Sequence, residues 1–460
     1  MSDSAFRQKT IPLFSGMVAV MLAAAGCRTI EQARSAQTED DRLDGEVTVS
    51  PQAVGITNGC TATIDQLSDI ALRYHPSILQ ASQSVVTAHS RIQSTRAGYL
   101  PQVSVNGGYT RSTHNGRRNE SEMSGNWSGG ISLDLLLYDF GKLDAQEQQA
   151  IENLIAAEKQ LRQSQVDVLY NVRSKFFEVH RTSHLLIVAQ ENLNQYKVHL
   201  DEAKSMLKVG TRRKYDVTKA EVDYGNAQLE VISASNNLIS AKAELNAALG
   251  FADSPQYNLQ ESQLPKRQID DAPDALMEFA RKNSPSLAVL RARERAASAY
   301  VDETIASFYP SITAGVSADV SGKSFPLAFN WSWFGRVMED LFTGFRRTAQ
   351  VEIAVAELRS ARAAVAQAEQ TLYLELVQAV AQRDSARERS AVSRKTFEQA
   401  TENFDIVNEQ YRVGTSSSIE RTDAQVQVTQ ARADMVRSFY DEQIAQAKIA
   451  SLIGLLQEPR

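Results

Sequence analysis

The residues best placed for metal chemistry are His180 and His184, which stand four residues apart in a stretch with a helical pattern. That spacing puts two imidazoles on one helix face, as in many zinc sites. The sequence supplies neither a third ligand nearby nor a glutamate between the two histidines, so we predict no metal site. A glycine-rich phosphate loop, a nucleophile elbow and a carboxylate pair in a predicted pocket are also missing from the sequence. We therefore predict a protein that is not an enzyme and carries no cofactor.

Covalent chemistry is predicted at Cys27. Arg7 and Lys9 precede an apolar core at residues 17–25, which suits a signal peptide and is too short to span a bilayer. The segment Leu-Ala-Ala-Ala-Gly-Cys at residues 22–27 resembles a bacterial lipobox, in which the cysteine is acylated and becomes the first residue. We predict a signal peptide at residues 1–26 and lipidation of Cys27, with ordinary cleavage beside Cys27 as the alternative.

The residues after Cys27 are polar and predict a tether over residues 27–62. Fully extended, such a segment reaches about 100 Å. Arg28 resembles a signal for sorting to the outer rather than the inner membrane. Cys60 is the only other cysteine; it is either a lone packed thiol or, if Cys27 is not acylated, a disulfide partner in an oxidising periplasm.

The composition of the chain limits which partners and which fold class we expect. A net charge of -6 gives no basic footprint for nucleic acid, so no nucleic-acid partner is predicted. Eleven prolines in 460 residues, with abundant helix-forming residues, favour long helices.

The chain contains the same landmarks twice. Val413-Gly414-Thr415 and Gly454 reappear 204 residues earlier as Val209-Gly210-Thr211 and Gly250. His75-Pro76 and Tyr99-Leu100-Pro101 recur 209 residues later as Ser284-Pro285 and Phe308-Tyr309-Pro310. The chain is therefore predicted to be two versions of one structural unit.

Periodicity assigns the same elements to both copies. The first, residues 63–250, has a proline-interrupted helix, a β-hairpin at about 102–134, a long helix at about 141–208 and a return helix at about 214–249. After a linker at 251–272, the second, residues 273–454, has a helix, a hairpin at about 311–334, a long helix at about 345–412 and a return helix at about 417–453, before a tail at 455–460. Apolar residues repeat at seven along the long helices, which predicts coiled-coil packing.

The two hairpins have strands of about ten residues that are apolar on one face and small or polar on the other. Ile312, Ala314 and Val316, for example, alternate with Thr313 and Gly315. This length and period match transmembrane β-barrel strands. Four strands cannot close a barrel, and open edges are not tolerated in lipid, so three copies would supply twelve strands. The alternative for one isolated hairpin is packing on a soluble core.

Together these features resemble the TolC-type outer-membrane channel family over essentially the whole chain after the tether. The resemblance rests on the duplicated proline-containing helix, the Tyr-x-Pro entry to the strands, and the Val-Gly-Thr turns followed five residues later by Asp216 or Glu420. It implies a mainly α fold with a membrane β-barrel portion: a homotrimer with a twelve-stranded barrel in the Gram-negative outer membrane, continued by an α-helical coiled-coil tunnel. It also implies a periplasmic adaptor and an inner-membrane pump of the resistance-nodulation-division or ABC type.

The resemblance also implies roles for residues at the periplasmic tips. Two turns match the tips that adaptors contact, although both could simply cap helices; their residues are Val209, Gly210, Thr211, Val413, Gly414 and Thr415. Glu420 and Asp423 match paired acidic positions that line the tunnel constriction, and a solvated helix face is the alternative. Asp216 and Lys219 are their equivalents in the first copy.

The closing contacts implied by the resemblance differ in this chain. Tyr411 matches the tyrosine of the closed-state lock. Ser416 stands where some members carry the lock arginine, and Arg212 occupies that place in the first copy. The closing network is therefore expected to be rewired here.

The predicted function is a passive exit channel, gated at the periplasmic helix tips, for small molecules such as drugs or metals, or for secreted proteins. The lipobox favours drug or metal efflux. The alternative is a non-conducting trimeric coiled-coil scaffold or adhesin of the cell envelope.

Overall fold

The computed structural model describes residues 61–115, 121–210, 213–251, 253, 255, 257–262 and 272–455. The predicted signal peptide, Cys27, Cys60, Thr211 and Arg212 lie outside these described residues. The elements of the first copy are β1 (Thr61–Ala62), α2 (Ile64–Tyr74), α3 (Pro76–Arg96), η2 (Ala97–Tyr99), β2 (Gln102–Asn115), β3 (Ser121–Tyr138), α4 (Lys142–Lys208) and α5 (Lys214–Leu249). Those that follow are β4 (Asn258–Leu259), α6 (Pro273–Asn283), α7 (Pro285–Ala306), β5 (Ser311–Gly322), β6 (Ala328–Met338), α8 (Arg346–Arg412) and α9 (Ser418–Leu452).

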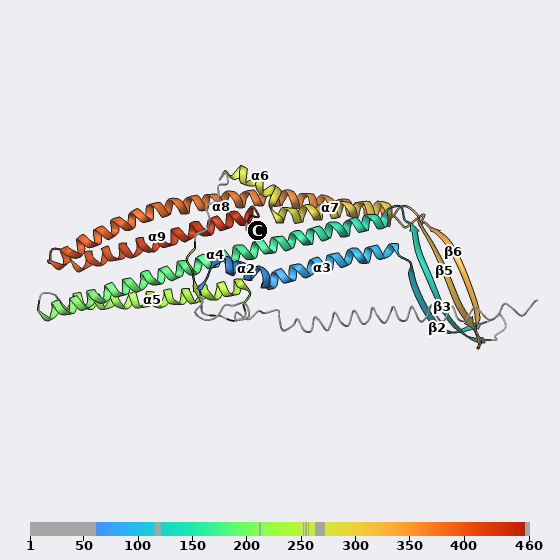
Figure 1. The fold of residues 1–460 in the computed structure, drawn as a ribbon, viewed down its shortest axis with the longest axis horizontal. Helices are drawn as coiled ribbons and strands as arrows, with labels where there is room; N and C mark the ends of the chain where they lie inside the picture. The colour runs from blue at the N-terminus through green and yellow to red at the C-terminus, as the bar shows by residue number, and fades with distance from the viewer. Residues whose placement is uncertain are drawn as a thin grey trace, which may run out of the picture.

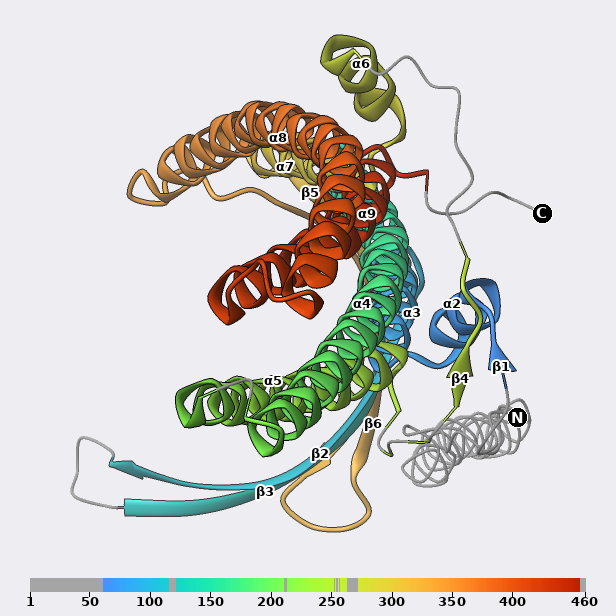
Figure 2. The same cartoon turned by 90° about the vertical axis from the view of Figure 1, so that its left-hand side faces the viewer.

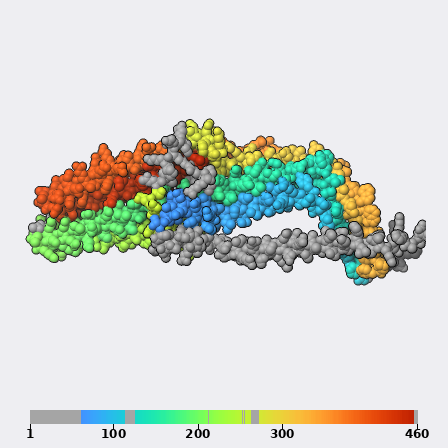
Figure 3. All heavy atoms as spheres, viewed as in Figure 1, coloured from blue at the N-terminus to red at the C-terminus, as the bar shows by residue number. Residues whose placement is uncertain are grey.

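The molecule is a rod of helices with a β-sheet at one end (Figures 1 and 3). α4 and α8 each have 67 residues and are therefore about 100 Å long. Near the sheet the helices pack in the order α3-α4-α7-α8, and towards the far end in the order α5-α4-α9-α8. Viewed along the rod, these layers form one curved wall (Figure 2). No helix in the described part of the chain is both long and apolar enough to cross a membrane.

The two prolines that interrupt the shorter helices do so in the same way. His75 and Ser284 have extended backbones, and Pro76 and Pro285 each start a new helix, where the missing N–H costs nothing. The glycine that ends each return helix lies against this interruption. A Cβ on Gly250 would stand 2.9 Å from Pro76, and one on Gly454 would stand 2.8 Å from the Asn283 carbonyl. The duplicated landmarks are therefore paired in space.

Each copy has its own hydrophobic core around this junction. In the first, Leu67 of α2 packs with Val172 of α4 and Leu249 of α5. In the second, Leu276 of α6 packs with Leu376 of α8 and Ile453 after α9. Leu276 and Leu376 are the duplicated counterparts of Leu67 and Val172, so the repeat extends from the sequence to the packing.

Four of the described strands form one antiparallel sheet in the order β2-β3-β5-β6. Its register aligns apolar residues across all four strands on one face: Val105, Ile131, Ala318 and Trp331 form one such row, and Val103, Leu133, Val316 and Trp333 the next. The opposite face carries mostly small and polar residues, including pairs of serines whose hydroxyls lie 2.7–2.8 Å apart. A sheet with one apolar face and one polar face fits a barrel wall between lipid and water.

Two details differ from the expected boundaries. β3 continues to Tyr138 and β6 to Met338, four residues beyond the expected hairpin ends. The run Leu135-Leu136-Leu137 breaks the alternation, and the pairing with β5 has a bulge between Leu136 and Tyr138. In addition, β4 in the expected linker pairs in parallel with β1 at the end of the expected tether, a contact that no local pattern indicated.

Candidate functional site

The two helix turns that the sequence singled out lie at the same end of the rod, opposite the sheet (Figure 1). Gly210 and Gly414 have left-handed backbones, with φ of 78° and 85°. A Cβ on either would meet nothing within 4 Å, so the conformation rather than space requires glycine. Val209 and Val413 beside them are 74% exposed. Each turn thus presents an apolar side chain to solvent beside its left-handed glycine.

The acidic residues after the turns cap the return helices. The Ser417 N–H donates to the Glu420 carboxylate at 2.9 Å, and the Arg213 N–H donates to Asp216 at 3.3 Å. The Ser416 hydroxyl also donates to Glu420. Hydrogen bonds from Ser416 and then from Ser417 lower the pKa of Glu420 below its ordinary value. Glu420 is therefore held ionised at the tip.

Asp423 lies one turn beyond Glu420 and is also exposed. Burial, followed by the carboxylates of Asp223, Glu230 and Asp423, raises the pKa of Tyr196 on α4 to about 12. Asp423 therefore contributes to a negative region between the α8–α9 tip and α4. The structure brings Glu420 and Asp423 onto adjoining turns of one exposed helix face.

Tyr411 is fully buried and packs between helices rather than facing solvent. Its ring meets His199 of α4 edge-on at 5.5 Å between centroids. The guanidinium of Arg421 lies 5.2 Å from the Tyr411 ring centroid, which is a cation–π contact. Tyr411 thus belongs to a cluster that joins the α8–α9 tip to α4.

Arg421 links this cluster to both sides. Its Nε donates to Asn408 Oδ1 at 2.7 Å, and its Nη2 lies 3.5 Å from Glu202 Oε2. Burial lowers the pKa of Arg421, and the Glu202 carboxylate opposes that shift, so the guanidinium stays charged. Sequence reasoning missed Arg421 and Glu202. The available signal was an arginine three residues before Ala424, on the face that the small residues of α9 use for packing.

The Arg421–Glu202 pair is one rung of a polar seam, which we define as the α4–α9 contacts from Arg181–Asp441 to Glu202–Arg421. Arg181 lies 3.0 Å from Asp441, and Asn192 accepts a hydrogen bond of 2.9 Å from Thr429. Arg432 pairs with Glu191 in between. Since α4 and α9 are antiparallel, the partners run in opposite numerical order. Polar contacts thus join the two helical hairpins here, in addition to the apolar packing of Tyr440 and Val436 against the first hydrophobic core.

The two histidines first considered for zinc lie at the Arg181–Asp441 end of the seam. His180 and His184 stack on Tyr440, whose hydroxyl donates to Glu261 at 3.1 Å. Glu261 also lies 3.8 Å from His184. Burial lowers the pKa of His180, which keeps this imidazole neutral. Across the described ranges no group of three or more histidine, cysteine, aspartate or glutamate side chains is arranged to hold a metal ion.

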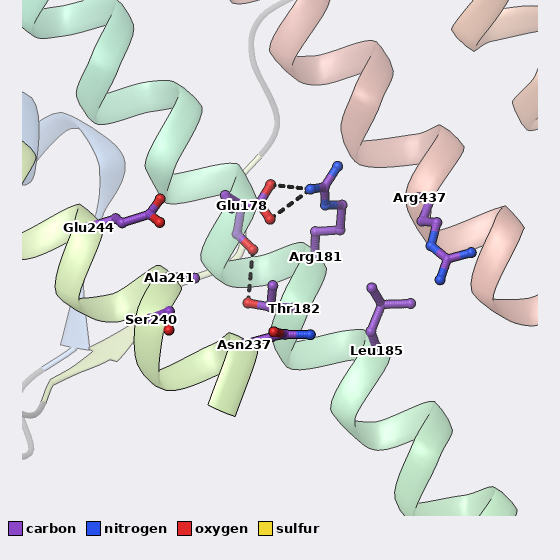
Figure 4. A pocket seen from close by; sticks show the side chains of 9 residues that line it. All are labelled: Glu178, Arg181, Thr182, Leu185, Asn237, Ser240, Ala241, Glu244 and Arg437. Atoms are coloured by element: carbon purple, nitrogen blue, oxygen red, sulfur yellow. Dashed lines mark hydrogen bonds and ion pairs between the residues drawn. The ribbon is translucent and has the colours of Figure 1, made fainter. Parts of the chain in front are cut away.

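A cavity of about 330 Å³ lies beside the seam, between α4, α5 and α9. Figure 4 shows Glu178 and Arg181 paired across one α4 turn, with Arg437 of α9 opposite them. Glu244 of α5 completes the charged part of the lining. The cavity is polar and marks a gap in the packing between the two hairpins.

Comparison with known proteins agrees with this architecture. The family model described as "Outer membrane efflux protein" matches residues 67–251 and 276–455. The chain is 24% identical over 384 residues to outer membrane protein OprJ of Pseudomonas aeruginosa, covering 79% of this chain and 78% of that one. It is 22% identical over 392 residues to cation efflux system protein CusC of Escherichia coli O157:H7, covering 84% of each.

Solved structures share the fold. The CmeC outer membrane channel of Campylobacter jejuni superposes with a TM-score of 0.77 at 15% identity, covering 85% of each chain. Outer membrane protein VceC of Vibrio cholerae gives 0.74 at 15% identity, covering 85% of this chain and 96% of that one. These likenesses confirm the predicted fold class, a mainly helical body with a membrane β-sheet portion.

Proposed function

The chain belongs to the outer membrane efflux protein family, and from that premise we propose that three copies form a passive exit channel, gated at its periplasmic tips. Its place is the Gram-negative outer membrane and its general role is efflux.

One observation carries the proposal: the sheet has two opposite faces and two open edges. β2 and β6 each pair with one strand only among the described residues. In lipid, unpaired backbone groups cost several kcal/mol each, so the edges must be closed by other copies. Pairing β6 of one chain with β2 of the next is a head-to-tail contact that closes into a ring. Three copies give twelve strands, within the range of bacterial barrels.

The helical wall supports the same closure. In the half of the rod away from the sheet, the helices at the two edges of the wall are α5 and α8. They belong to the same sides of the chain as the edge strands β2 and β6. Both carry large apolar side chains that are more than half exposed in the single chain: Val222, Leu229, Ile232 and Ile239 on α5, and Val392 and Ile406 on α8. On α5 three of them are spaced by seven and three, the pattern of a coiled-coil face. A neighbouring copy would cover them.

Purified full-length protein in detergent is expected to have the mass of three chains and to conduct ions in planar bilayers. A closed channel and a non-conducting scaffold would both pass no current. The double variant Glu420→Ala, Asp423→Ala separates them, because removing the acidic side chains at the tips should open a closed channel. A trimer that passes no current in either form would favour the alternative function, a coiled-coil scaffold or adhesin. A monomer that is soluble without detergent would contradict both.

We place the gate at the helix tips. Threefold symmetry would turn Glu420 and Asp423 into rings of carboxylates, which favour cations. The polar seam and the Tyr411–Arg421 cluster would hold the α8–α9 tip against α4 in the closed state. Adaptor binding at the exposed Val209 and Val413 would select the open state.

Replacing Ser416 by alanine is expected to make the cation preference of the channel disappear at a higher pH. The Ser416 hydroxyl is the largest cause of the lowered Glu420 pKa, so its loss raises that pKa. Glu420 then loses its charge earlier as the pH falls. The measurement is the reversal potential in a KCl gradient between pH 7 and pH 3. A matching change at Ser418, also a buried serine of this turn, should leave the midpoint in place. An unchanged midpoint in Ser416→Ala would exclude Glu420 from the constriction.

The partners and cargo follow from the family at a coarser level. We propose a periplasmic adaptor and an inner-membrane pump, of the resistance-nodulation-division or ABC type, as the source of energy. Lipidation at Cys27, outside the described residues, would add an anchor in outer-membrane lipid. Relatives are named for cation and solvent efflux, which supports small-molecule cargo over secreted proteins. A deletion strain scored for drug and metal sensitivity and for missing secreted proteins separates these classes.

A further inference from the structure

A large aromatic side chain lies across the polar face of the sheet, where the other residues are mostly small. Phe334 of β6 pairs with Gly315 of β5, and a Cβ on that glycine would stand 2.5 Å from the Phe334 ring and 2.9 Å from the Leu133 carbonyl oxygen. Gly315 is buried in the single chain, whereas the other residues of β5 are partly or fully exposed to solvent. The far end of the ring therefore lies over the glycine, in space that a side chain at this position would fill.

Arg336 uses this ring as a platform. Two residues along the same strand, and so on the same face, its guanidinium carbon lies 4.7 Å from the Phe334 ring centroid. Such a cation–π contact orients the guanidinium while leaving its N–H groups available to solvent. Arg336 itself is exposed. The pair thus presents an ordered positive charge above the polar face.

The position of this charge in the sheet is well defined. Arg336 pairs with Thr313, two residues from the end of β6 where the chain turns towards α8. Among strand residues with described side chains, 102–112, 125–138, 311–322 and 328–338, it is the only cation on the polar face; Arg111 falls on the opposite face by alternation. Among the same residues, the carboxylates on the polar face are Asp134, one pairing row away, and Asp319, further from the helices.

We propose that Arg336 is a specificity-determining residue of the pore, positioned by Phe334 and Gly315 to favour anionic solutes where the helical tunnel enters the barrel. This rests on the proposed trimeric channel, in which the polar face lines the lumen and three guanidinium groups form a ring. A ring of fixed charges of one sign sets which ions enter a pore. The acidic tips act at the other end of the tunnel with the opposite sign.

Arg336→Gln is expected to lower the chloride-to-potassium permeability ratio roughly two- to fivefold in 0.1 M KCl, because three positive charges leave the lumen. The effect should shrink in 1 M KCl, where charges are screened within about 3 Å. Reversal potentials in planar bilayers are measured for the wild type, Arg336→Gln and Arg336→Lys, which keeps the charge. The same measurements are repeated in proteins that also carry Glu420→Ala and Asp423→Ala, so that the acidic tip does not determine the permeability ratio. Lys282→Gln removes one positive charge from α6, outside the curved wall (Figure 2), and should change nothing.

Gly315→Ala gives a second, independent variant. It keeps every charge but forces Phe334 away from the sheet, so the ratio should fall in the same direction by less. A current with the same ratio in the wild type and Arg336→Gln, in both backgrounds, would overturn this inference and leave the channel intact. Should Arg336→Gln not assemble, an unchanged ratio in Gly315→Ala overturns it instead. Absence of current from every form would overturn the channel proposal and this inference with it.

Discussion

Arginine in place of Val316 is expected to abolish insertion of the protein into the outer membrane, whereas arginine at the next residue, Ser317, is expected to be tolerated. Val316 lies near the middle of β5, paired with Leu133 and Trp333 on the apolar face. An arginine facing lipid near the bilayer midplane costs about 2–4 kcal/mol per chain, and a closed trimer would contain three. That sum rivals the whole stability of many proteins.

Ser317 is a matched control, because it lies on the opposite face of the sheet from Val316 but at nearly the same depth in the membrane. It pairs with Ser132 and Ser332, and its hydroxyl lies 2.8 Å from that of Ser332. An arginine there would point into the aqueous lumen and keep its hydration. The measurement is the amount of assembled protein in outer-membrane fractions, compared on unheated and heated gels. Equal loss in both variants, or loss in Ser317→Arg alone, would show that the two faces have been assigned wrongly.

The parts of the fold that follow local periodicity could be predicted from the sequence. A strand between lipid and water must alternate at every second residue, and a wall of long helices must repeat at about seven. The duplicated landmarks gave the same information a second time. The structure adds the reason for their spacing, because Gly250 and Gly454 end their helices against the interruptions at Pro76 and Pro285. Several elements depend on this pattern at once, which is why both copies show it.

The tip shows where local patterns become insufficient. Ser417 and Glu420 fit a capping box, a local signal that could have been recognised beside the constriction role. The Arg421–Glu202 contact could not, because it depends on the register between α4 and α9, and that register is set by packing along the entire seam. The β1–β4 pair has the same origin, since two short segments far apart in sequence meet only after the helices assemble.

Replacing Arg421 by alanine is expected to open the channel, raising its open fraction by about tenfold. Arg421 contacts Tyr411, Asn408 and Glu202, so its loss leaves polar groups of two helical hairpins without their shared partner. Breaking a buried ion pair typically costs 3–5 kcal/mol. Glu202 keeps 35% of its side chain exposed, so we expect a smaller effect here, about 1–2 kcal/mol. A shift of about 1.4 kcal/mol between closed and open tips changes their ratio tenfold.

Arg412→Ala is the matched control. Arg412 ends α8 at the same tip, but its side chain is 62% exposed and its ion pair is a local one with Glu409, three residues before it, at 3.1 Å. Exposed pairs of this kind contribute little to stability, so the conductance should stay at the wild-type level. Glu202→Gln should resemble Arg421→Ala in direction, since it weakens the same contact from the other helix.

Single-channel recording gives the open fraction directly, and uptake of large antibiotics by cells that express each variant tests the same opening in the membrane. Trimer recovery is compared first, so that a leaky barrel is not mistaken for an open tip. The decisive comparison is then between two arginines of one tip that differ in burial. If Arg421→Ala trimers stay as closed as those of Arg412→Ala, the Tyr411–Arg421 cluster is packing alone, and the gate must be held by contacts between neighbouring copies.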